Sequence, residues 1–436
     1  MNINRIFVAC AFTWNNKGDA ALLMATAQAV RRTLNGVQLS FSSFTPELDS
    51  NKYGEKVVRM PVDPTGRPSH VLHSLGVAGP LLLRWTLGLV LLAFRIWLVL
   101  RHLLPEALRY RVLGPIAPAA REIVESDLVI ALPGGYLQSL QWQDDYWLFH
   151  WLLLSMAKAA NKPVVIYAQS IGPFDRVHQI WAKKLLRRID VLSVREEFSE
   201  QRLHDYGVAS DRIVLVPDAA FGLTSDSRSQ EEFAKFSKWL DSHPHPWIGV
   251  SVREHQFPGA PDPDACMDHY IGEVAKAADR MIELATGTVF FVPQCIKSGG
   301  QDIQVSGAVI ERMQHRNHAV IVDADLSPLT LQQLYGQFEM LIGTRMHANI
   351  LAMCAGAPVA AIAYERKTNG IMKMIGLDDC VIDIDAIIGG LVPLVERVFA
   401  ARLRIREHLK NAIPPIRDRA IATPTILLQM LNAQRT

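Results

Sequence analysis

The run MLIGTRMHANILAMCAGAPVAAI at positions 340–362 contains two short apolar segments on either side of a helical pattern. Residues 340–342 and 359–362 resemble buried strands, because each is a brief apolar run bounded by Gly or Pro. Residues 346–355, rich in Ala, Leu and Met, favour a helix. A strand, a helix and a second strand in this order predict a βαβ unit, whose two strands are parallel.

The same alternation extends through most of the chain. Strand-like runs occur at 5–12, 39–44, 128–132, 164–168, 191–194 and 213–216, and a second series begins at 248–252. Such alternation predicts an α/β protein with doubly wound parallel sheets. We expect two Rossmann-like domains facing each other across a cleft, at residues 1–222 and 247–385. A polar linker at 223–246 and a helical tail at 386–436 complete the predicted organisation.

Composition narrows the class of protein. The chain has 436 residues, of which 49% are hydrophobic and 20% charged, so a disordered chain is excluded. A net charge of +2 gives no general attraction to nucleic acid. The five cysteines form no C-x-x-C pair, which argues against a zinc ribbon or a disulfide framework. Residues 1–5 do not begin a signal peptide. We therefore expect a cytoplasmic protein.

Residues 81–100 form the most apolar segment, LLLRWTLGLVLLAFRIWLVL. Its length is sufficient to span a bilayer, but Arg84 and Arg95 interrupt it. On a helix, these arginines, Gly88 and His102 fall on one stripe, and the rest of the surface is apolar. This pattern is typical of a helix lying on the inner face of a membrane. A helix buried in the core or docked in a homo-oligomer is the alternative.

Ligands of open parallel sheets bind beyond the carboxyl ends of the strands. Polar side chains follow predicted strands at this edge at Asp19, Gln169, Arg195, Arg253, Gln294, Arg345 and His347. Asn16, Gly18 and Asp19 precede a helix predicted from Ala20, whose free N–H groups suit an anion. Alternatively, Asp19 only caps that helix. Gly134-Gly135 predicts either close backbone approach to a ligand or a turn.

The segment Gly343-Thr344-Arg345-Met346-His347 couples a guanidinium to an imidazole where a strand becomes a helix. Arginine matches the oxygens of a carboxylate or phosphate, and histidine transfers protons near neutral pH. The structural alternative is an arginine paired to an acid and a histidine that caps the helix. No histidine spacing suggests a metal site.

Taken together, the strand-end motifs resemble the polysaccharide pyruvyl transferase family. The resemblance covers about residues 5–380 and rests on motifs that occur in the family's order: Asn16-Lys17-Gly18-Asp19-Ala20, Leu132-Pro133-Gly134-Gly135, Gln169-Ser170-Ile171-Gly172-Pro173, Val194-Arg195-Glu196-Glu197, Val216-Pro217-Asp218, Val292-Pro293-Gln294, Gly343-Thr344-Arg345-Met346-His347 and Tyr364-Glu365-Arg366-Lys367. It implies a fold like that of GT-B glycosyltransferases. It also implies transfer of the enolpyruvyl group of phosphoenolpyruvate to two hydroxyls of a sugar, free or lipid-linked, without a further cofactor.

The resemblance also implies roles for individual residues. Arg345 and His347 carry over from the family's Arg-x-His element, and the second donor arginine is placed at Arg253, with Arg195 as the competing choice. His347 is the expected proton carrier, and Asp19 the group that orients the sugar or takes a proton. The remaining expected donor contacts are Met346, Gln294 and Lys367, and the remaining acceptor contacts are Asn16, Gly18, Gly134, Gly135 and Gln169.

Two other classes of function remain open from the sequence. One is a nucleotide-sugar glycosyltransferase of the same fold, and the other is a non-catalytic membrane-docked component of a polysaccharide export complex. The paired Arg345 and His347 argue against the second, because a structural component needs neither an anion clamp nor a proton carrier.

Overall fold

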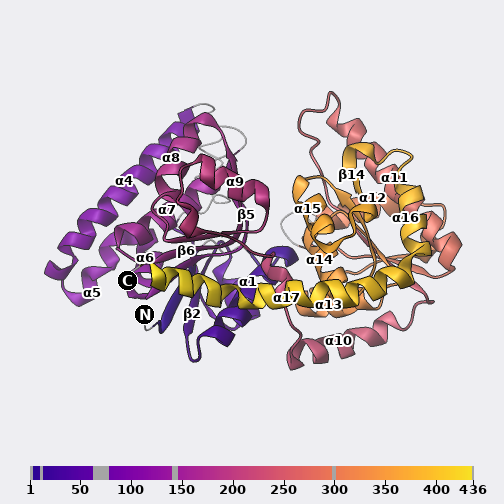
Figure 1. Ribbon diagram of the computed structural model, residues 1–436, viewed down its shortest axis with the longest axis horizontal. Helices are drawn as coiled ribbons and strands as arrows, with labels where there is room; N and C mark the ends of the chain where they lie inside the picture. The colour runs from indigo at the N-terminus through magenta and orange to yellow at the C-terminus, as the bar shows by residue number, and fades with distance from the viewer. Residues whose placement is uncertain (1–2, 10–12, 62–77, 140–145, 297–300, 435–436) are drawn as a thin grey trace. The chain divides into compact units, whose positions relative to one another are not determined.

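The protein is described by a computed structural model that covers residues 3–9, 13–61, 78–139, 146–296 and 301–434. Contacts between residues divide the chain into two units (Figure 1). The first lies within Met1–Trp14, Leu22–Ala219 and Arg419–Thr436, and the second within Asn15–Ala21 and Ala220–Asp418. The predicted fold class is confirmed, because each unit is built on a parallel sheet with helices.

The first unit has a parallel sheet in the order β3-β2-β1-β4-β6-β7-β8, with β5 paired to β6. Its strands are β1 (Arg5–Ala9), β2 (Gln38–Ser43), β3 (Lys56–Arg59), β4 (Leu128–Ala131), β5 (Gly134–Ser139), β6 (Val164–Phe174), β7 (Val191–Val194) and β8 (Ile213–Leu215). Its helices are α1 (Lys17–Thr33), α2 (Pro46–Tyr53), α4 (Ala78–Leu100), α5 (Glu106–Arg109), α6 (Ala117–Glu125), α7 (Tyr146–Ala159), α8 (Arg176–Leu186) and α9 (Glu197–Asp205). The central strand β4, with the sequence LVIA, is buried throughout, as expected for a strand covered on both faces.

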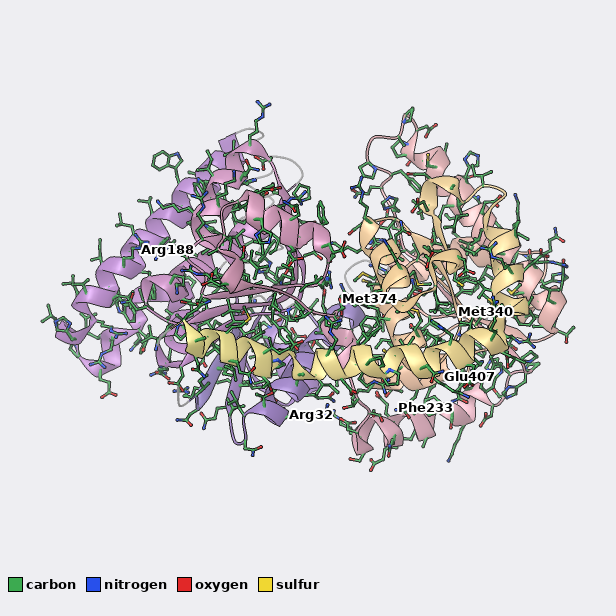
Figure 2. All side chains as sticks on the ribbon, in the orientation of Figure 1. Arg32, Arg188, Phe233, Met340, Met374 and Glu407 are labelled. Atoms are coloured by element: carbon green, nitrogen blue, oxygen red, sulfur yellow. The ribbon has the colours of Figure 1, made fainter. Side chains whose placement is uncertain are left out.

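The second unit has a parallel sheet in the order β11-β10-β9-β12-β13-β14. Its strands are β9 (Trp247–Ser251), β10 (Thr288–Phe291), β11 (Ala319–Ile321), β12 (Leu341–Gly343), β13 (Val359–Ala363) and β14 (Val381–Asp383). Its helices are α10 (Ser227–Leu240), α11 (Pro263–Ala285), α12 (Gln301–Arg312), α13 (Pro328–Gly336), α14 (Met346–Cys354), α15 (Arg366–Ile375), α16 (Leu391–Ala400) and the first part of α17 (Arg402–Ala433). Met340, labelled in Figure 2, is fully buried directly before β12.

The strand order of the second sheet is that of a doubly wound nucleotide-binding fold. The order reverses between β9 and β12, which are direct neighbours with Gly343 opposite Ser251. Ligands of such sheets bind at the carboxyl ends of the strands beside this reversal. The topology therefore singles out the residues after β9 and β12.

The residue ranges of the two units differ from the predicted domain ranges in three places. Residues Asn15–Ala21 belong to the second unit, although they follow the first strand of the chain. The predicted linker 223–246 contains α10, which is capped by Asp226 and packs against α13 of the second unit. The predicted tail contains α17, which contributes to both units, with the division at Arg419. Composition alone could not separate a polar surface helix from a linker.

Three local predictions also differ from the structure: the start of a helix, a possible turn and the end of a strand. Helix α1 begins at Lys17 rather than Ala20, so Gly18 and Asp19 are in its first turn and Asp19 is no cap. Gly134-Gly135 begins β5 instead of forming a turn. Strand β6 continues through Gln169 to Phe174, beyond the predicted end at Ala168. Pairing with both β5 and β7 sustains the longer strand.

Helix α4 confirms the predicted apolar helix but not its predicted basic stripe. Arg84 is buried, and its Nη2 donates a hydrogen bond to Nε2 of His178 in α8 over 2.8 Å. Trp97 is also buried, and stacks on Phe94. The inward face of α4 therefore includes one of the two arginines that were expected to meet lipid headgroups.

Candidate functional site

Four parallel strands of the second unit end at one edge, and each is followed by a side chain with functional chemistry. Arg253 follows β9, Gln294 follows β10, Arg345 follows β12, and Tyr364 follows β13. The strands are paired in register, with Val250 beside both Phe291 and Ile342. The sheet therefore gathers four side chains that are far apart in the sequence.

Arg345 is held by a buried carboxylate. It occupies the N-cap position of α14, and its Nε donates a 3.0 Å hydrogen bond to Oδ2 of Asp302, while Nη2 contacts Oδ1. Burial lowers the pKa of Arg345, but the Asp302 carboxylate, together with Cys295 and Tyr364, holds that pKa above its ordinary value. Pairing with an acid was the structural alternative for Arg345. These contacts use one edge of the guanidinium, however, and arginine has five N–H donors.

Asp302 also fixes the loop that follows β10. Its Oδ2 accepts the backbone N–H groups of Gln294 and Cys295, each over 3.0 Å. The Gln294 side chain, expected to contact the donor, is buried, and its Nε2 donates to the hydroxyl of Tyr335 over 2.6 Å. One carboxylate thus couples the β10 loop to Arg345.

The start of α1 packs directly on this loop. The backbone N–H of Lys17 donates to the carbonyl of Gln294 over 2.9 Å, and Asn16 forms an antiparallel bridge with Cys295. Asn16 caps the helix, since its Oδ1 accepts the N–H of Gly18 over 3.1 Å. The Lys17 side chain is fully buried and pairs with Asp325. Asn16, Gly18 and Asp19 therefore lie in the second unit, with the expected donor residues.

Gly18 lies against the imidazole of His347. A Cβ atom built at position 18 would be 2.3 Å from Nδ1 of His347 and 2.9 Å from its Cγ. Such a separation is far inside van der Waals contact, so only glycine fits there without displacing the ring. His347 is the second residue of α14 and is half-buried. It is not the N-cap of that helix, a position that Arg345 occupies.

Arg253 is the most available cation at this edge. Its guanidinium carbon lies 4.1 Å from the centre of the Tyr364 ring, and its Nε donates to the carbonyl of Glu254. In the part of the chain that the structure describes, no carboxylate forms an ion pair with it. Burial raises the pKa of Tyr364 above its ordinary value, while the positive charges of Arg253 and Arg345 both lower it. Both guanidinium groups are therefore close enough to Tyr364 to affect its hydroxyl.

The other expected donor contacts are nearby in the fold. Met346 is the first residue of α14. Lys367 is the second residue of α15, a helix that begins directly after Tyr364 and Glu365. The Lys367 ammonium is 2.9 Å from a carboxylate oxygen of Glu365. Lys367 is thus partly neutralised by its neighbour.

The remaining predicted residues are in the first unit. Arg195 follows β7, where its buried guanidinium pairs with Asp218 and its Nε donates to Ser170 over 3.0 Å. Gly134 is paired with Gln169 across β5 and β6, and the Gln169 side chain is buried. Arg195 therefore already has a buried acidic partner. Arg253, the competing choice for the second donor arginine, follows β9 at the same edge of the second sheet as Arg345.

A family model described as polysaccharide pyruvyl transferase matches residues 16–366, which is most of the chain. The chain belongs to the polysaccharide pyruvyl transferase family. It is also 27% identical over 264 residues to the amylovoran biosynthesis protein AmsJ of Erwinia amylovora. That similarity covers 59% of this chain and 63% of AmsJ, so the chain matches less than two thirds of the length of that relative.

Solved structures agree on the fold of this pyruvyl transferase family member. HepE from Anabaena, in complex with UDP, is 13% identical with a TM-score of 0.56 and covers 99% of this chain and 100% of its own. UDP-GlcNAc 2-epimerase from Neisseria meningitidis, bound to UDP-GlcNAc, is 10% identical with a TM-score of 0.56, covering 98% and 100%. At such identities the similarity shows the fold alone.

Sequence reasoning missed two charged residues of this candidate site. Asp302 is eight residues beyond Gln294 in the first turn of α12, and Lys17 lies within a motif already singled out. The sequence signal for Lys17 was its position between Asn16 and Gly18. The sequence indicated no functional role for Asp302, because an acidic residue near the start of a helix is common. Among the described residues, no three His, Cys, Asp or Glu side chains are grouped to hold a metal ion.

Proposed function

We propose that this protein transfers the enolpyruvyl group of phosphoenolpyruvate to two hydroxyls of a sugar in a polysaccharide or its lipid-linked precursor. The products are a pyruvate ketal and phosphate. One observation carries the proposal: Arg253, Arg345 and His347 follow the two strands at which the order of the second sheet reverses. Membership of the family supports the same reaction.

The donor chemistry suits these residues. Phosphoenolpyruvate has a carboxylate and a phosphate, and a guanidinium binds either group through paired hydrogen bonds. We assign Arg253 to one anionic group, because it has no acidic partner among the described residues. Arg345 binds the other through the edge that Asp302 leaves open. The N-terminus of α14, with nine residues from Met346 to Cys354, adds free N–H groups that favour an anion.

The reaction balances without an oxidant or reductant. The oxygen of the first hydroxyl bonds to C2 of the donor and gives up its proton, while one proton is added to the methylene carbon, which becomes the methyl group. The bond between C2 and the phosphate oxygen then breaks. The second hydroxyl bonds to C2, and its proton leaves with phosphate. His347 delivers the proton to the methylene carbon, and Asp19 orients or deprotonates a sugar hydroxyl.

This reaction belongs in the cytoplasm, a compartment in which thiols stay reduced. The described cysteines are thiols and form no disulfides with one another.

The proposal is tested by incubating the protein with phosphoenolpyruvate and a panel of free and lipid-linked glycans. Phosphate release should depend on the glycan, and mass spectrometry should show a glycan carrying a pyruvate ketal. Arg253→Ala should abolish binding of phosphoenolpyruvate. Arg195→Ala should mainly lower the stability of the fold, because it leaves the buried Asp218 without its partner. No phosphate release with any glycan, together with no binding of phosphoenolpyruvate, would overturn the proposal.

A nucleotide-sugar transferase is the competing function. HepE and the epimerase were solved with UDP or a UDP-sugar, and their fold is shared. The same incubations with UDP-glucose and UDP-GlcNAc separate the two donors. Consumption of the nucleotide-sugar and not of phosphoenolpyruvate would favour the competing function.

A further inference from the structure

Helix α4 has two apolar faces, and only one of them packs on the protein. Figure 1 shows α4 along the outer side of the first unit, next to α7 and α8. Leu83, Leu87 and Phe94 on its inner face are buried. The window Leu82–Leu103 is long and apolar enough to cross a membrane by length and composition, yet only 28% of it is buried. A core helix of the same composition would be mostly buried.

The outer face of α4 is an exposed stripe of large apolar side chains. Trp85 is 73% exposed and Val99 67% exposed. The stripe consists of Leu82, Trp85, Leu89, Leu92, Ile96 and Val99. These positions are spaced by three or four residues, so they lie on one side of the helix, opposite the buried face. A contiguous exposed apolar surface of this kind marks a contact with a membrane or with another protein surface.

Further exposed apolar side chains follow α4 in the sequence. Leu103 is 70% exposed in the turn after the helix, and Val112 is 57% exposed a little further on. At about 1.5 Å per residue, the stripe on α4 alone is roughly 25 Å long. The stripe is therefore much longer than a socket for a single side chain.

The charged residues of α4 beyond Arg84, and of the segment that follows the helix, are almost all positive. Residues 85–116 contain four arginines, Arg95, Arg101, Arg109 and Arg111, and one acid, Glu106. Arg95 and Arg111 are exposed. Trp85 adds the amphipathic ring that favours the boundary between headgroups and acyl chains. An exposed apolar stripe, together with exposed arginines in the same helix and in the segment after it, is complementary to a bilayer that contains anionic lipids.

We propose that the outer face of α4 docks the protein on the surface of an anionic membrane, with the helix lying in the plane of the bilayer. Spanning is incompatible with this packing, because the inner face of α4 is occupied by its own unit and contains the buried Arg84. The expected headgroup contacts are Arg95 and Arg111, in place of the pair Arg84 and Arg95 that the sequence suggested. This inference does not depend on the proposed reaction, since lipid binding requires neither donor nor sugar.

The test is co-sedimentation of the purified protein with phosphatidylcholine vesicles, with or without phosphatidylglycerol, at low and high salt. The parent protein should bind the anionic vesicles, and high salt should weaken binding. Arg95→Glu with Arg111→Glu should lower the partition coefficient by at least about tenfold, because each basic residue near such a surface contributes a several-fold effect. Trp85→Asp with Leu89→Asp should abolish binding.

Leu403→Asp is the matched control, because Leu403 is 70% exposed on α17 and should leave vesicle binding unchanged. Circular dichroism establishes that each variant is folded. Brominated lipids should also quench the fluorescence of the parent more than that of Trp85→Phe. If the parent does not sediment with anionic vesicles, or both double variants sediment like the parent, the proposal is wrong. A dimer that Trp85→Asp with Leu89→Asp converts to a monomer, without vesicle binding by the parent, would instead identify the face as a contact between copies.

Discussion

The backbone of Gly18 touches His347 so closely that a Cβ atom at position 18 would be 2.3 Å from Nδ1 of the imidazole. Gly18 is in the first turn of α1, and His347 is in the first turn of α14. The contact joins a segment near the start of the chain to the second sheet. It also fixes the orientation of the side chain that we propose to transfer the proton.

Gly18→Ala should therefore impair catalysis without unfolding the protein. The added methyl group forces the imidazole to move, and a displacement of about 1 Å at a reacting group costs about 10²-fold in rate. We expect kcat to fall by about that factor, measured as phosphate release. Gly307→Ala in α12 is the matched control, because, its own helix and neighbours aside, no atom of the described residues lies within 4 Å of a Cβ built there. Equal rates for both variants would show that the contact has no catalytic role.

His347→Ala should lower kcat by about 10²–10⁴, the usual contribution of a general acid or base. Binding of phosphoenolpyruvate should change much less, because the arginines hold the anionic groups. Isothermal titration and phosphate release measure the two quantities separately. His269→Ala, on the exposed surface of α11, should behave like the parent. Parent-like turnover by His347→Ala would remove the histidine from the mechanism.

Arg345→Lys should weaken donor binding by about tenfold or more. Lysine keeps the positive charge but lacks the planar fork that pairs with Asp302 and that we propose binds a donor anion at the same time. Titration calorimetry with phosphoenolpyruvate measures the loss. Arg280→Lys is the control, because Arg280 also pairs with acids, Glu283 and Glu396, but lies on α11. Unchanged affinity for phosphoenolpyruvate in Arg345→Lys would mean that Arg345 only pairs with Asp302 and does not bind the donor.

Asp302→Ala should destabilise the protein by about 3 kcal/mol, because it leaves a mostly buried guanidinium and two backbone N–H groups without their acceptor. Asp268→Ala removes an exposed ion pair with Arg312, which solvent screens, and should leave the free energy of unfolding nearly unchanged. Urea unfolding measures both free energies. If the two variants were equally stable, Asp302 would not be the anchor of the β10 loop and Arg345.

Within the described residues, the sequence by itself determined the alternation of strands and helices, the two parallel sheets, and the position of Arg345 and His347 at a strand-to-helix junction. These features are local: short apolar runs bounded by Gly or Pro predict buried strands, and polar residues after parallel strands meet at one edge. The motif at 343–347 therefore indicated a strand-to-helix junction at the edge of a sheet, and the structure places it between β12 and α14.

Only the tertiary structure decided which segments meet. Arg345 and Asp302 are separated by 43 residues, and their pairing depends on the order in which β10, β9 and β12 lie in the sheet. Lys17 and Gly18 join the second unit through contacts that no local pattern encodes. Helical periodicity placed Arg84 and Arg95 on one stripe, but the packing of α4 on its neighbours buried the first and exposed the second. Periodicity states which side chains share a face, whereas the burial of that face depends on the elements that pack against it.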